Sequence, residues 1–460
     1  MAGGFQFRVH DTLAARKVRL RPSTKRGKQE LSLYVCGVTP YDSGHMGHAF
    51  TFCMFDILVR HAEAHGVRVR YVQNVTDVDD PLFERARRDG VDWRLLADRE
   101  TAVHIRDMTA LGWRPPDFMP KVSEEISRIL AAATRLHRAG YTYKTDALYF
   151  EVSRFKRYGR LSHRTRASML RKLREEGLLG TVGPDAKRDA LDFPLWRESA
   201  AGEPSWPSAF GPGRPGWHIE CSAMSMSLLG ERFDIHTGGA DNVFPHHEAE
   251  IAQSEGVTGH RVVGHWVHGQ LLFLSGTRMA KSAGNFFRVT ELVEQGHDPL
   301  AFRYLALQAK YRAPLNFSPD GLAGADRALR QLREKVSAWT GGAGGSRGDF
   351  AERFLAAIND DLDLPAVMAL VSELTHSDLA PGTKASLLLD WDRVLGLDLD
   401  RSTAAPRALP AAAADLLARR ERARAEKDFA TADRLRAELA ALGVHVTDGP
   451  DGQSWKVAVR

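Results

Sequence analysis

The sequence predicts an α/β protein whose first and largest part is built on a parallel sheet. Residues 31–36 have the composition of a buried strand, apolar residues recur at helical spacing over 45–64, and residues 67–75 alternate as a second strand. A strand, a helix and a strand at this spacing form a βαβ unit, whose crossover makes its two strands parallel. A helical region and a small mixed module are expected to follow along the chain.

The composition indicates a globular protein of several domains. At 460 residues the chain is too long for one compact core. Its 43% hydrophobic and 26% charged residues are ordinary for such proteins, and no apolar run is long enough to span a bilayer. Charges occupy the N-terminal stretch where a signal peptide would need apolar residues, so we expect a cytoplasmic protein with no membrane contact.

The first domain is expected to cover residues 1–310. Residues 83–140 have a largely helical pattern, and a polar, basic stretch then interrupts the α/β pattern as an insertion at about 110–215. The α/β pattern resumes with a strand, a helix and another strand, predicted at 233–239, from near Pro245, and at 265–274.

Two smaller domains are predicted after the first. Residues 311–400 have the pattern of an α-helical bundle, interrupted by a glycine-rich linker at 341–349. A second linker, rich in alanine and proline, leads into a C-terminal module at 410–460. In that module residues 416–443 are predicted as one strongly basic helical segment, followed by a hairpin with its turn at 448–452.

The turn HMGH is the first motif with chemical content. His45 and His48 flank Gly47 at the start of the first predicted helix. A helix N-terminus offers unpaired N–H groups and a positive dipole end, and glycine lets a nucleotide approach the backbone. Two imidazoles there can stabilise charge on a phosphate. Histidines beside a glycine are also common as surface or capping residues, so the motif alone does not decide.

A second motif, TRMAKSAGN, places Lys281 among small and turn-forming residues after a strand. A lysine on such a loop can neutralise a pyrophosphate leaving group in the transition state, whereas an isolated one is usually a solvated charge. Together the HMGH turn and this loop resemble the two signature motifs of class I aminoacyl-tRNA synthetases.

Cysteine, histidine and glutamate residues raise the question of a metal. Cys36 and Cys221 are each expected at the end of a strand, and His246 and Glu250 lie at i, i+4 on one helix face. Sulfur, nitrogen and oxygen ligands of these types suit zinc. A buried cysteine is more often a small hydrophobe, however, and the three cysteines of the chain, which include Cys53, form no recognisable disulfide framework.

Spacing leaves other ligands open as well. His247 and Glu248 are adjacent to the candidate ligands and compete with them for the same role. Packing, redox chemistry, nucleophilic attack and metal binding all remain possible roles for Cys36 at this point.

Several segments together carry a more specific resemblance. They are YVCGVTPYD with HMGH, YVQNVTDVDD, GWHIECSAM, FDIHTGGADNVFPHHEAEIAQSE and RMAKSAGNF. They occur in the order found in the cysteinyl-tRNA synthetase family, which the chain resembles over nearly its whole length. The C-terminal ARAEKDFATADRLRAELAALGVHVTDGPDGQSW resembles that family's anticodon-side module. The resemblance implies a Rossmann-like catalytic domain with an inserted subdomain, an α-helical bundle and a small α/β module.

The resemblance also implies an activity. The expected reaction is ATP-dependent ligation of L-cysteine to the 3′ end of tRNA(Cys) through a cysteinyl-adenylate, with Mg²⁺ accompanying ATP. One Zn²⁺ per subunit would bind the substrate thiolate and so reject serine. Its implied ligands are Cys36, Cys221, His246 and Glu250. A cytoplasmic monomer is expected.

The family's functional positions carry over to this sequence. His45, His48 and Lys281 are implied to be catalytic. The implied nucleotide contacts are Gly37, Thr39, Gly47, Gly238, Gly239, Asp241, Arg278, Met279 and Ser282. Trp217 is either a wall of the amino-acid pocket or a core aromatic residue. Asp448 and Trp455 are expected to contact tRNA, by a base edge and by stacking.

The chain departs from the family pattern at a few positions. Arg278 and Ala280 stand where the usual loop has lysine and serine, and Thr237 stands where many members have glycine. Arg278 remains a cation, but its planar fork differs from an ammonium group, which affects the kinetics of the loop more than the activity itself.

Two other functions remain open. The ligase that joins cysteine to a glucosaminyl-inositol in mycothiol synthesis has similar CGVTPYD, GHA and TDVDDPLFERA segments, and residues 38–40 lean toward it. That ligase needs no anticodon module, whereas this chain carries a basic C-terminal segment. A non-catalytic RNA-binding relative would be expected to have lost Lys281, the HMGH histidines or a zinc ligand, and none is lost.

Overall fold

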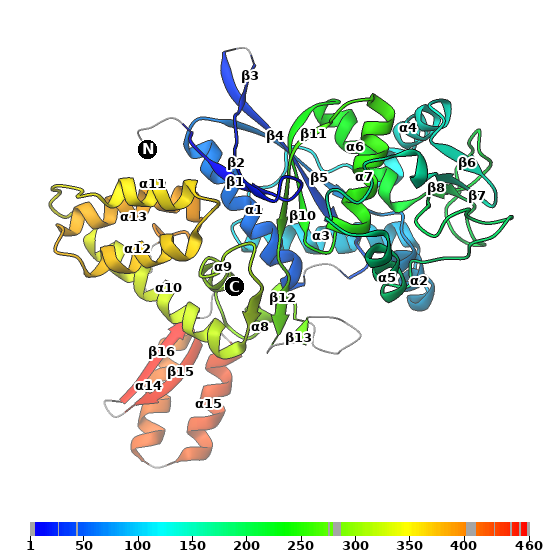
Figure 1. Cartoon of the computed structure of the whole chain (residues 1–460). Helices are drawn as coiled ribbons and strands as arrows, with labels where there is room; N and C mark the ends of the chain where they lie inside the picture. Colours follow the sequence, from blue (N-terminus) through cyan, green and yellow to red (C-terminus); the bar gives the residue numbers. More distant parts are fainter. Residues whose placement is uncertain are drawn as a thin grey trace. The chain divides into compact units, whose positions relative to one another are not determined.

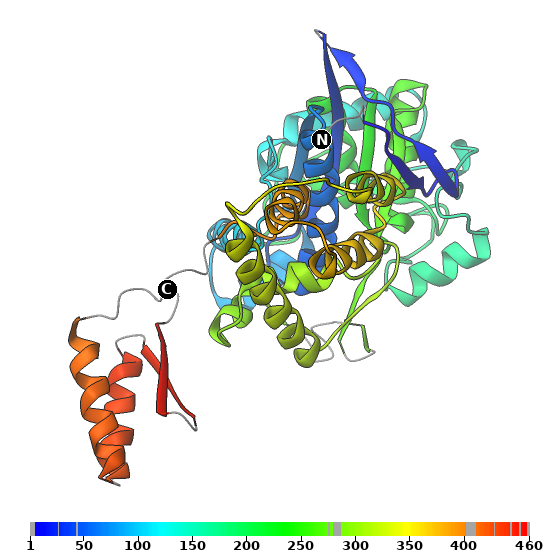
Figure 2. The same cartoon turned by 90° about the vertical axis from the view of Figure 1, so that its left-hand side faces the viewer.

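The computed structural model describes residues 5–25, 27–42, 45–274, 277–278, 287–401, 411–426, 428–441, 444–449 and 452–457. Figures 1 and 2 show the elements along the chain. The chain divides into two units, Met1–Leu399 and Asp400–Arg460, and each is described by itself. None of the described helices combines the length and the apolar character needed to cross a membrane.

A mostly parallel sheet of five strands forms the centre of the first unit (Figure 1). β4 (Lys28–Val38) pairs in parallel with β5 (Arg68–Val75) on one side and with β10 (Phe233–Gly239) on the other. β11 (Val263–Gly269) continues the parallel sheet beside β10, and β3 (Ser23–Lys25) adds a short antiparallel edge to the start of β4. The parallel α/β fold predicted from the sequence is confirmed.

Helices cover both faces of this sheet. α1 (Met46–Ala64) packs in the hydrophobic cluster that contains Leu33, and α6 (Trp217–Leu229) and α7 (Glu248–Thr258) contribute to the cluster that contains Tyr34. Alternate side chains of β4 thus enter two different cores, which explains its uninterrupted apolar run.

The segment between β5 and α6 contains helices and a second sheet. Its elements are α2 (Asp80–Asp89), α3 (Trp93–Ala110), η1 (Val122–Glu124), α4 (Ile126–Arg138), β6 (Thr142–Lys144), β7 (Ala147–Phe150), η2 (Val152–Arg154), α5 (Arg166–Glu175), β8 (Phe193–Arg197) and β9 (Arg214–Pro215). The strands β6, β7, β8 and β9 form an antiparallel sheet in that order, within the region predicted as an insertion.

Short strands and a set of helices follow β11, and a hairpin precedes β3. These elements are β12 (Leu272–Leu274), β13 (Thr277–Arg278), α8 (Val289–Glu294), α9 (Pro299–Ala306), β14 (Leu315–Phe317), α10 (Pro319–Trp339), α11 (Phe350–Asn359), α12 (Leu364–His376) and α13 (Pro381–Leu395), with β1 (Arg8–Asp11) and β2 (Arg16–Arg19) at the N-terminal side. The single strand predicted at 265–274 is wrong. After Gly269 the chain leaves the central sheet, because the Gln270 N–H donates to Tyr311 O at 2.7 Å and β12 then pairs with β14.

The helices α10 to α13 pack into the same hydrophobic cluster as α1. A fully buried ion pair reinforces this packing: Arg303 Nη2 on α9 lies 2.5 Å from Asp56 Oδ2 on α1, and Arg303 Nε donates to Leu395 O at 2.6 Å. A domain boundary near residue 310 therefore stays a prediction, as do the other boundaries proposed from the sequence.

The second unit consists of α14 (Ala411–Ala425), α15 (Phe429–Ala441), β15 (Val444–Gly449) and β16 (Gly452–Val457). The prediction of one helical segment here is wrong, because two helices form. Asp428 Oδ1 accepts from Thr431 N at 3.1 Å and so starts the second helix. β15 and β16 pair in antiparallel fashion, as the predicted hairpin requires.

Candidate functional site

A cavity of about 630 Å³ lies at the carboxyl ends of the central strands. The connections of β4 and β10 lead to strands on opposite sides, so the two meet at a switch point of the sheet, where ligands of α/β proteins bind. Most residues that the resemblance assigned line this cavity: Cys36, Gly37, Thr39, His45, Gly47, His48, Trp217, Cys221, Gly239, Asp241 and His246.

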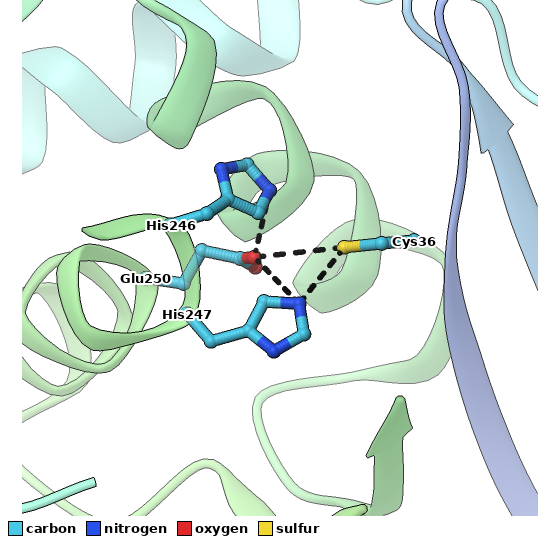
Figure 3. Close-up of side chains that lie close together, drawn as sticks. All are labelled: Cys36, His246, His247 and Glu250. Atoms are coloured by element: carbon cyan, nitrogen blue, oxygen red, sulfur yellow. Dashed lines mark hydrogen bonds and ion pairs between the residues drawn. The ribbon is translucent and has the colours of Figure 1, made fainter. Parts of the chain in front are cut away.

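The base of the cavity holds a compact group of candidate metal ligands (Figure 3). Cys36, His246, His247 and Glu250 each offer one ligand atom, all four are buried, and these atoms lie within 4.8 Å of one another. Cys36 Sγ lies 3.1 Å from His247 Nε2 and 3.8 Å from Glu250 Oε1, and Glu250 Oε1 lies 3.1 Å from His246 Nε2. Three elements of the protein thus converge on one small volume.

Cys221 joins the same group from α6. Its Sγ lies 3.9 Å from Cys36 Sγ. The expectation that Cys221 ends a strand is wrong, because the segment from Trp217 is a helix. Gly216 precedes this helix, and a Cβ there would lie 2.0 Å from Pro194 O, so only glycine allows the close approach.

An irregular helical turn presents the two adjacent histidines. η3 (Val243–His247) is an irregular turn in which Phe244 has an extended backbone conformation (φ −142°, ψ 130°), and it leads directly into α7. The second ring nitrogen of each histidine is engaged: His246 Nδ1 lies 2.9 Å from His218 Nδ1, and His247 Nδ1 lies 2.7 Å from His268 Nε2. Partners of this kind orient imidazoles that ligate a metal.

The protonation states at the base follow from burial. Burial raises the pKa of the Cys36 thiol and of the Glu250 carboxyl well above their ordinary values. The Cys36 thiol donates to Cys221 Sγ, and this hydrogen bond holds the pKa of Cys221 well below its ordinary value. Burial lowers the pKa of His247 far below 6.5, so its imidazole stays neutral. Thiolate and neutral imidazole are the forms that bind a metal ion.

The structure distinguishes the two residues, His247 and Glu248, that the sequence left as competing ligands. His247 points into the group of ligand atoms. Glu248 points elsewhere, because its carboxylate accepts from Ser162 N at 2.8 Å and from Ser162 Oγ at 2.9 Å. Trp217 stacks on His246, with ring centroids 4.2 Å apart, and lines the cavity, as a pocket wall would.

The HMGH turn lies on the other side of the cavity, at the start of α1. His45 is the N-cap of this helix, and its Nδ1 accepts from His48 N at 3.2 Å. The two rings stack with centroids 3.7 Å apart. A Cβ on Gly47 would lie 3.0 Å from His45 Nδ1, so a side chain there would crowd this arrangement.

The end of β10 also requires glycine. A Cβ on Gly238 would lie 2.8 Å from Asn242 Nδ2, and one on Gly239 would lie 2.4 Å from Asp241 Oδ1. Neighbouring side chains thus leave no room for a larger residue at either position.

The lysine loop falls largely outside the described residues. Met279, Lys281 and Ser282 are among the residues not described, and of Arg278 only the backbone, in β13, is described. The chain that follows the loop is tied to the HMGH turn, because Met46 N donates to Phe287 O at 3.0 Å.

An ion pair strengthens this connection. Arg288 Nη2 lies 2.5 Å from Asp42 Oδ1, just before the HMGH turn.

Asp448 and Trp455 lie on β15 and β16, whose backbone alone is described at these two positions.

Sequence reasoning missed some residues of the cavity. Asn74 and Thr76 line it at the end of β5, and His236 Nε2 lies 3.4 Å from Cys36 Sγ. The signal for the first two was available, because polar residues that directly follow a buried parallel strand lie at the edge where ligands bind.

Comparison with known families matches both units of the chain. Residues 22–327 match the model of the tRNA synthetases class I (C) catalytic domain, and residues 407–455 match that of the cysteinyl-tRNA ligase anticodon binding domain. Two curated relatives, named cysteine–tRNA ligase, come from Thioalkalivibrio sulfidiphilus and Chromohalobacter salexigens. Each is 40% identical, over 97% and 98% of this chain and 99% of each relative.

Solved structures show the same fold at low identity. Methionyl-tRNA synthetase of Mycobacterium tuberculosis, bound by methionyl-adenylate, has a TM-score of 0.57 at 13% identity and covers 81% of this chain and 89% of that one. A LeuRS–tRNA–LeuAMS complex from Agrobacterium radiobacter K84 has a TM-score of 0.59 at 10% identity, with coverage of 82% and 84%. With two family matches and relatives 40% identical over nearly the full length, the chain belongs to the cysteine–tRNA ligase family of class I tRNA synthetases.

Proposed function

We propose that this chain joins L-cysteine to the 3′ end of tRNA(Cys) in two steps, as a monomer in the cytoplasm. The observation that carries the proposal is one cavity with two chemically different ends: the HMGH turn at one end, and at its base the cysteines, His246 and Glu250. The relatives named cysteine–tRNA ligase cover nearly the whole chain, which supports the same reaction here.

The proposed first step forms cysteinyl-adenylate. A carboxylate oxygen of cysteine attacks the α-phosphorus of ATP, the bond to the β-phosphate breaks, and pyrophosphate leaves with Mg²⁺. His45 and His48, at the N-terminus of α1, are proposed to stabilise charge on the phosphates. Gly37, Thr39, Gly47, Gly238, Gly239 and Asp241 are the proposed contacts of the nucleotide.

The loop that contains Lys281 is proposed to act on the same step. Lys281, with Arg278, Met279 and Ser282 beside it, would neutralise the departing pyrophosphate. The bond between Met46 N and Phe287 O anchors the end of the loop next to the HMGH turn, which supports this role.

In the proposed second step the terminal ribose hydroxyl of tRNA attacks the carbonyl carbon of the adenylate, and AMP leaves. The enzyme's contribution to both steps is positioning and charge stabilisation, without a covalent enzyme intermediate. Asp448 and Trp455 in the terminal hairpin are proposed to contact bases of the tRNA.

We propose that the base of the cavity holds one Zn²⁺, with Cys36, Cys221, His246 and Glu250 as ligands. Two thiols, an imidazole and a carboxylate in a buried volume fit the donor types of zinc. Zinc bound there would ligate the substrate thiolate in preference to the hydroxyl of serine. His247 is an alternative to one of these four ligands, because its Nε2 lies 3.1 Å from Cys36 Sγ.

Replacement of single ligands tests this site. Cys221→Ala is expected to abolish bound zinc and to weaken cysteine binding far more than ATP binding. His246→Ala should lose zinc, whereas His247→Ala should retain it at reduced affinity. Zinc content by atomic emission and substrate affinity by calorimetry provide the measurements. A Cys221→Ala protein with full metal content and normal cysteine affinity would refute the zinc assignment.

The sugar ligase of mycothiol synthesis is not favoured as an alternative. The match to an anticodon-binding domain over 407–455 concerns a part that only a tRNA acceptor requires. An acceptor assay separates the two reactions: the protein is given radiolabelled cysteine and ATP with either tRNA or glucosaminyl-inositol. Label is expected in tRNA alone, and label in the amino-sugar alone would overturn the proposal.

A further inference from the structure

We infer that Asn74 is a positioning residue for the metal centre, because its carboxamide fixes the bulged end of β4 that carries Cys36. This inference rests on the proposed function for the presence of the ion. The contacts that carry it join the Asn74 side chain to Gly37, Cys221 and Thr76.

The pairing between β4 and β5 is irregular beside Cys36. Their regular pairing runs to Val35 opposite Gln73 and resumes at Val38 opposite Val75. Cys36 and Gly37 therefore face a single residue of β5, Asn74. A bulge of this kind interrupts the ladder and shifts the alternation of side chains. Val38 thereby returns to the same core as Val35, whereas Cys36 lies with Tyr34 on the other face and lines the cavity.

The side chain of Asn74 replaces the backbone partner that the bulge removes. Gly37 N donates to Asn74 Oδ1 at 2.9 Å. The two backbones are also in close contact, since a Cβ on Gly37 would lie 1.6 Å from Asn74 O. Asn74 is only 1% exposed, so water is a poor substitute for its oxygen.

The same amide reaches the second cysteine and the cavity wall. Cys221 Sγ lies 3.8 Å from Asn74 Oδ1, and Asn74 Nδ2 donates to Thr76 Oγ1 at 3.0 Å. One buried side chain thus contacts the backbone next to Cys36, the sulfur of Cys221 and a hydroxyl of a cavity-lining residue. Removal of the amide takes away the acceptor of the Gly37 N–H beside Cys36 and one contact of Cys221, so the 3.9 Å spacing of the two sulfurs is expected to be less well fixed.

The test compares zinc affinity of the full-length wild type with that of Asn74→Ala, by competition with a chromogenic chelator. The expected loss is about 10- to 100-fold, the usual effect of removing a partner outside the ligand set. The Co²⁺-substituted variant should show weakened thiolate-to-cobalt charge-transfer absorption. The KM for cysteine should rise more than the KM for ATP. Asn74→Asp retains an oxygen acceptor for Gly37 N and should recover most of the affinity.

A matched control separates positioning from simple destabilisation of the strand. Gln73 is equally buried on β5 but faces the opposite core, where it accepts from the Tyr71 hydroxyl. Gln73→Ala should lower the unfolding midpoint and leave zinc affinity and the cobalt spectrum unchanged. If Asn74→Ala does not fold, Asn74→Leu, which keeps the volume and removes the acceptor, takes its place with the same expectation.

Two results would overturn the inference. One is wild-type zinc affinity and cobalt spectrum in the variant that lacks the acceptor. The other is an equal loss of zinc affinity in Gln73→Ala, which would show a general effect of strand stability. A wild-type protein that binds no zinc, or that shows no cysteine-dependent pyrophosphate exchange, would instead refute the proposed function.

Discussion

Thr237 is a single residue whose side chain conflicts with its surroundings. It lies fully buried on β10, and its hydroxyl has no hydrogen-bond partner among the described residues. A buried hydroxyl without a partner costs about 1–3 kcal/mol. Thr237→Val removes the hydroxyl and keeps the shape, so we expect the free energy of unfolding to rise by about 1 kcal/mol.

The urea midpoint of Thr237→Val, compared with wild type, measures this gain, and cysteine-dependent pyrophosphate exchange should be unaffected. Thr237→Ser, which keeps the hydroxyl and loses a methyl group, is the control and should be less stable than wild type. A loss of stability in the valine variant would mean that the hydroxyl is paired in solution.

At the residue scale the sequence predicted much of the candidate site. Cys36, His246 and Glu250 meet as the resemblance implied, and the i, i+4 spacing places the latter two 3.1 Å apart. Spacing alone did not show which of His247 and Glu248 lies among the ligands, because the direction of each side chain depends on tertiary partners such as Ser162. The place of Asn74 near the end of a strand was visible in the sequence, but its pairing with the bulge was not, because a bulge is a property of pairing between strands and leaves no local signal.

At the scale of elements, His61 links α1 to α11. It is fully buried, its Nε2 lies 2.9 Å from Asn359 Oδ1, and its ring packs against Phe5 and Phe7. Burial lowers the pKa of His61 from 6.5 to about 4. Below pH 6.5 the unfolded chain takes up a proton that the folded chain does not bind, so stability falls as pH falls toward 4. The expected loss is roughly 3 kcal/mol by pH 4.

Urea midpoints measured from pH 7 to pH 4 check the role of His61. The wild type should lose stability steadily over this range, and His61→Gln should show a shallower decline from a lower starting point. His376, exposed on α12, serves as the control, and His376→Gln should follow the wild-type slope. Identical slopes for wild type and His61→Gln would contradict the assignment.

Most elements of the first unit were predictable from their pattern, but the type of α6 was not. The segment of α6 that contains Cys221 is buried from His218 to Met226, so it has no polar face from which a period could be read. Its assignment as a strand failed for that reason. The prediction of one helix for the basic segment of the second unit was wrong for another reason. A single capping contact of Asp428 divides this segment into α14 and α15.

At the scale of the whole molecule, the two units have separate cores. The core of the second unit consists of Ala413, Leu417, Leu439, Val444 and Val446. A chain that ends at Asp400 is therefore expected to fold and to keep cysteine-dependent pyrophosphate exchange. Its kcat/KM for tRNA should fall about tenfold or more, which corresponds to about 1.4 kcal/mol of lost binding in the transition state.

Steady-state charging and pyrophosphate exchange by the shortened chain supply the measurements. Equal losses in both assays would show that the second unit supports the fold of the first. Unchanged charging of tRNA would mean that the terminal module does not contribute to recognition.

Zinc held at the base of the cavity by the cysteines, the histidine and the glutamate is proposed to bind the substrate through its sulfur. X-ray absorption at the zinc edge, with and without bound L-cysteine, tests it most directly. Two sulfur ligands are expected in the free protein, from Cys36 and Cys221, and three after cysteine binds, with no change on addition of serine. An unchanged number of sulfur ligands in the presence of saturating cysteine would show that the zinc does not bind the substrate thiolate.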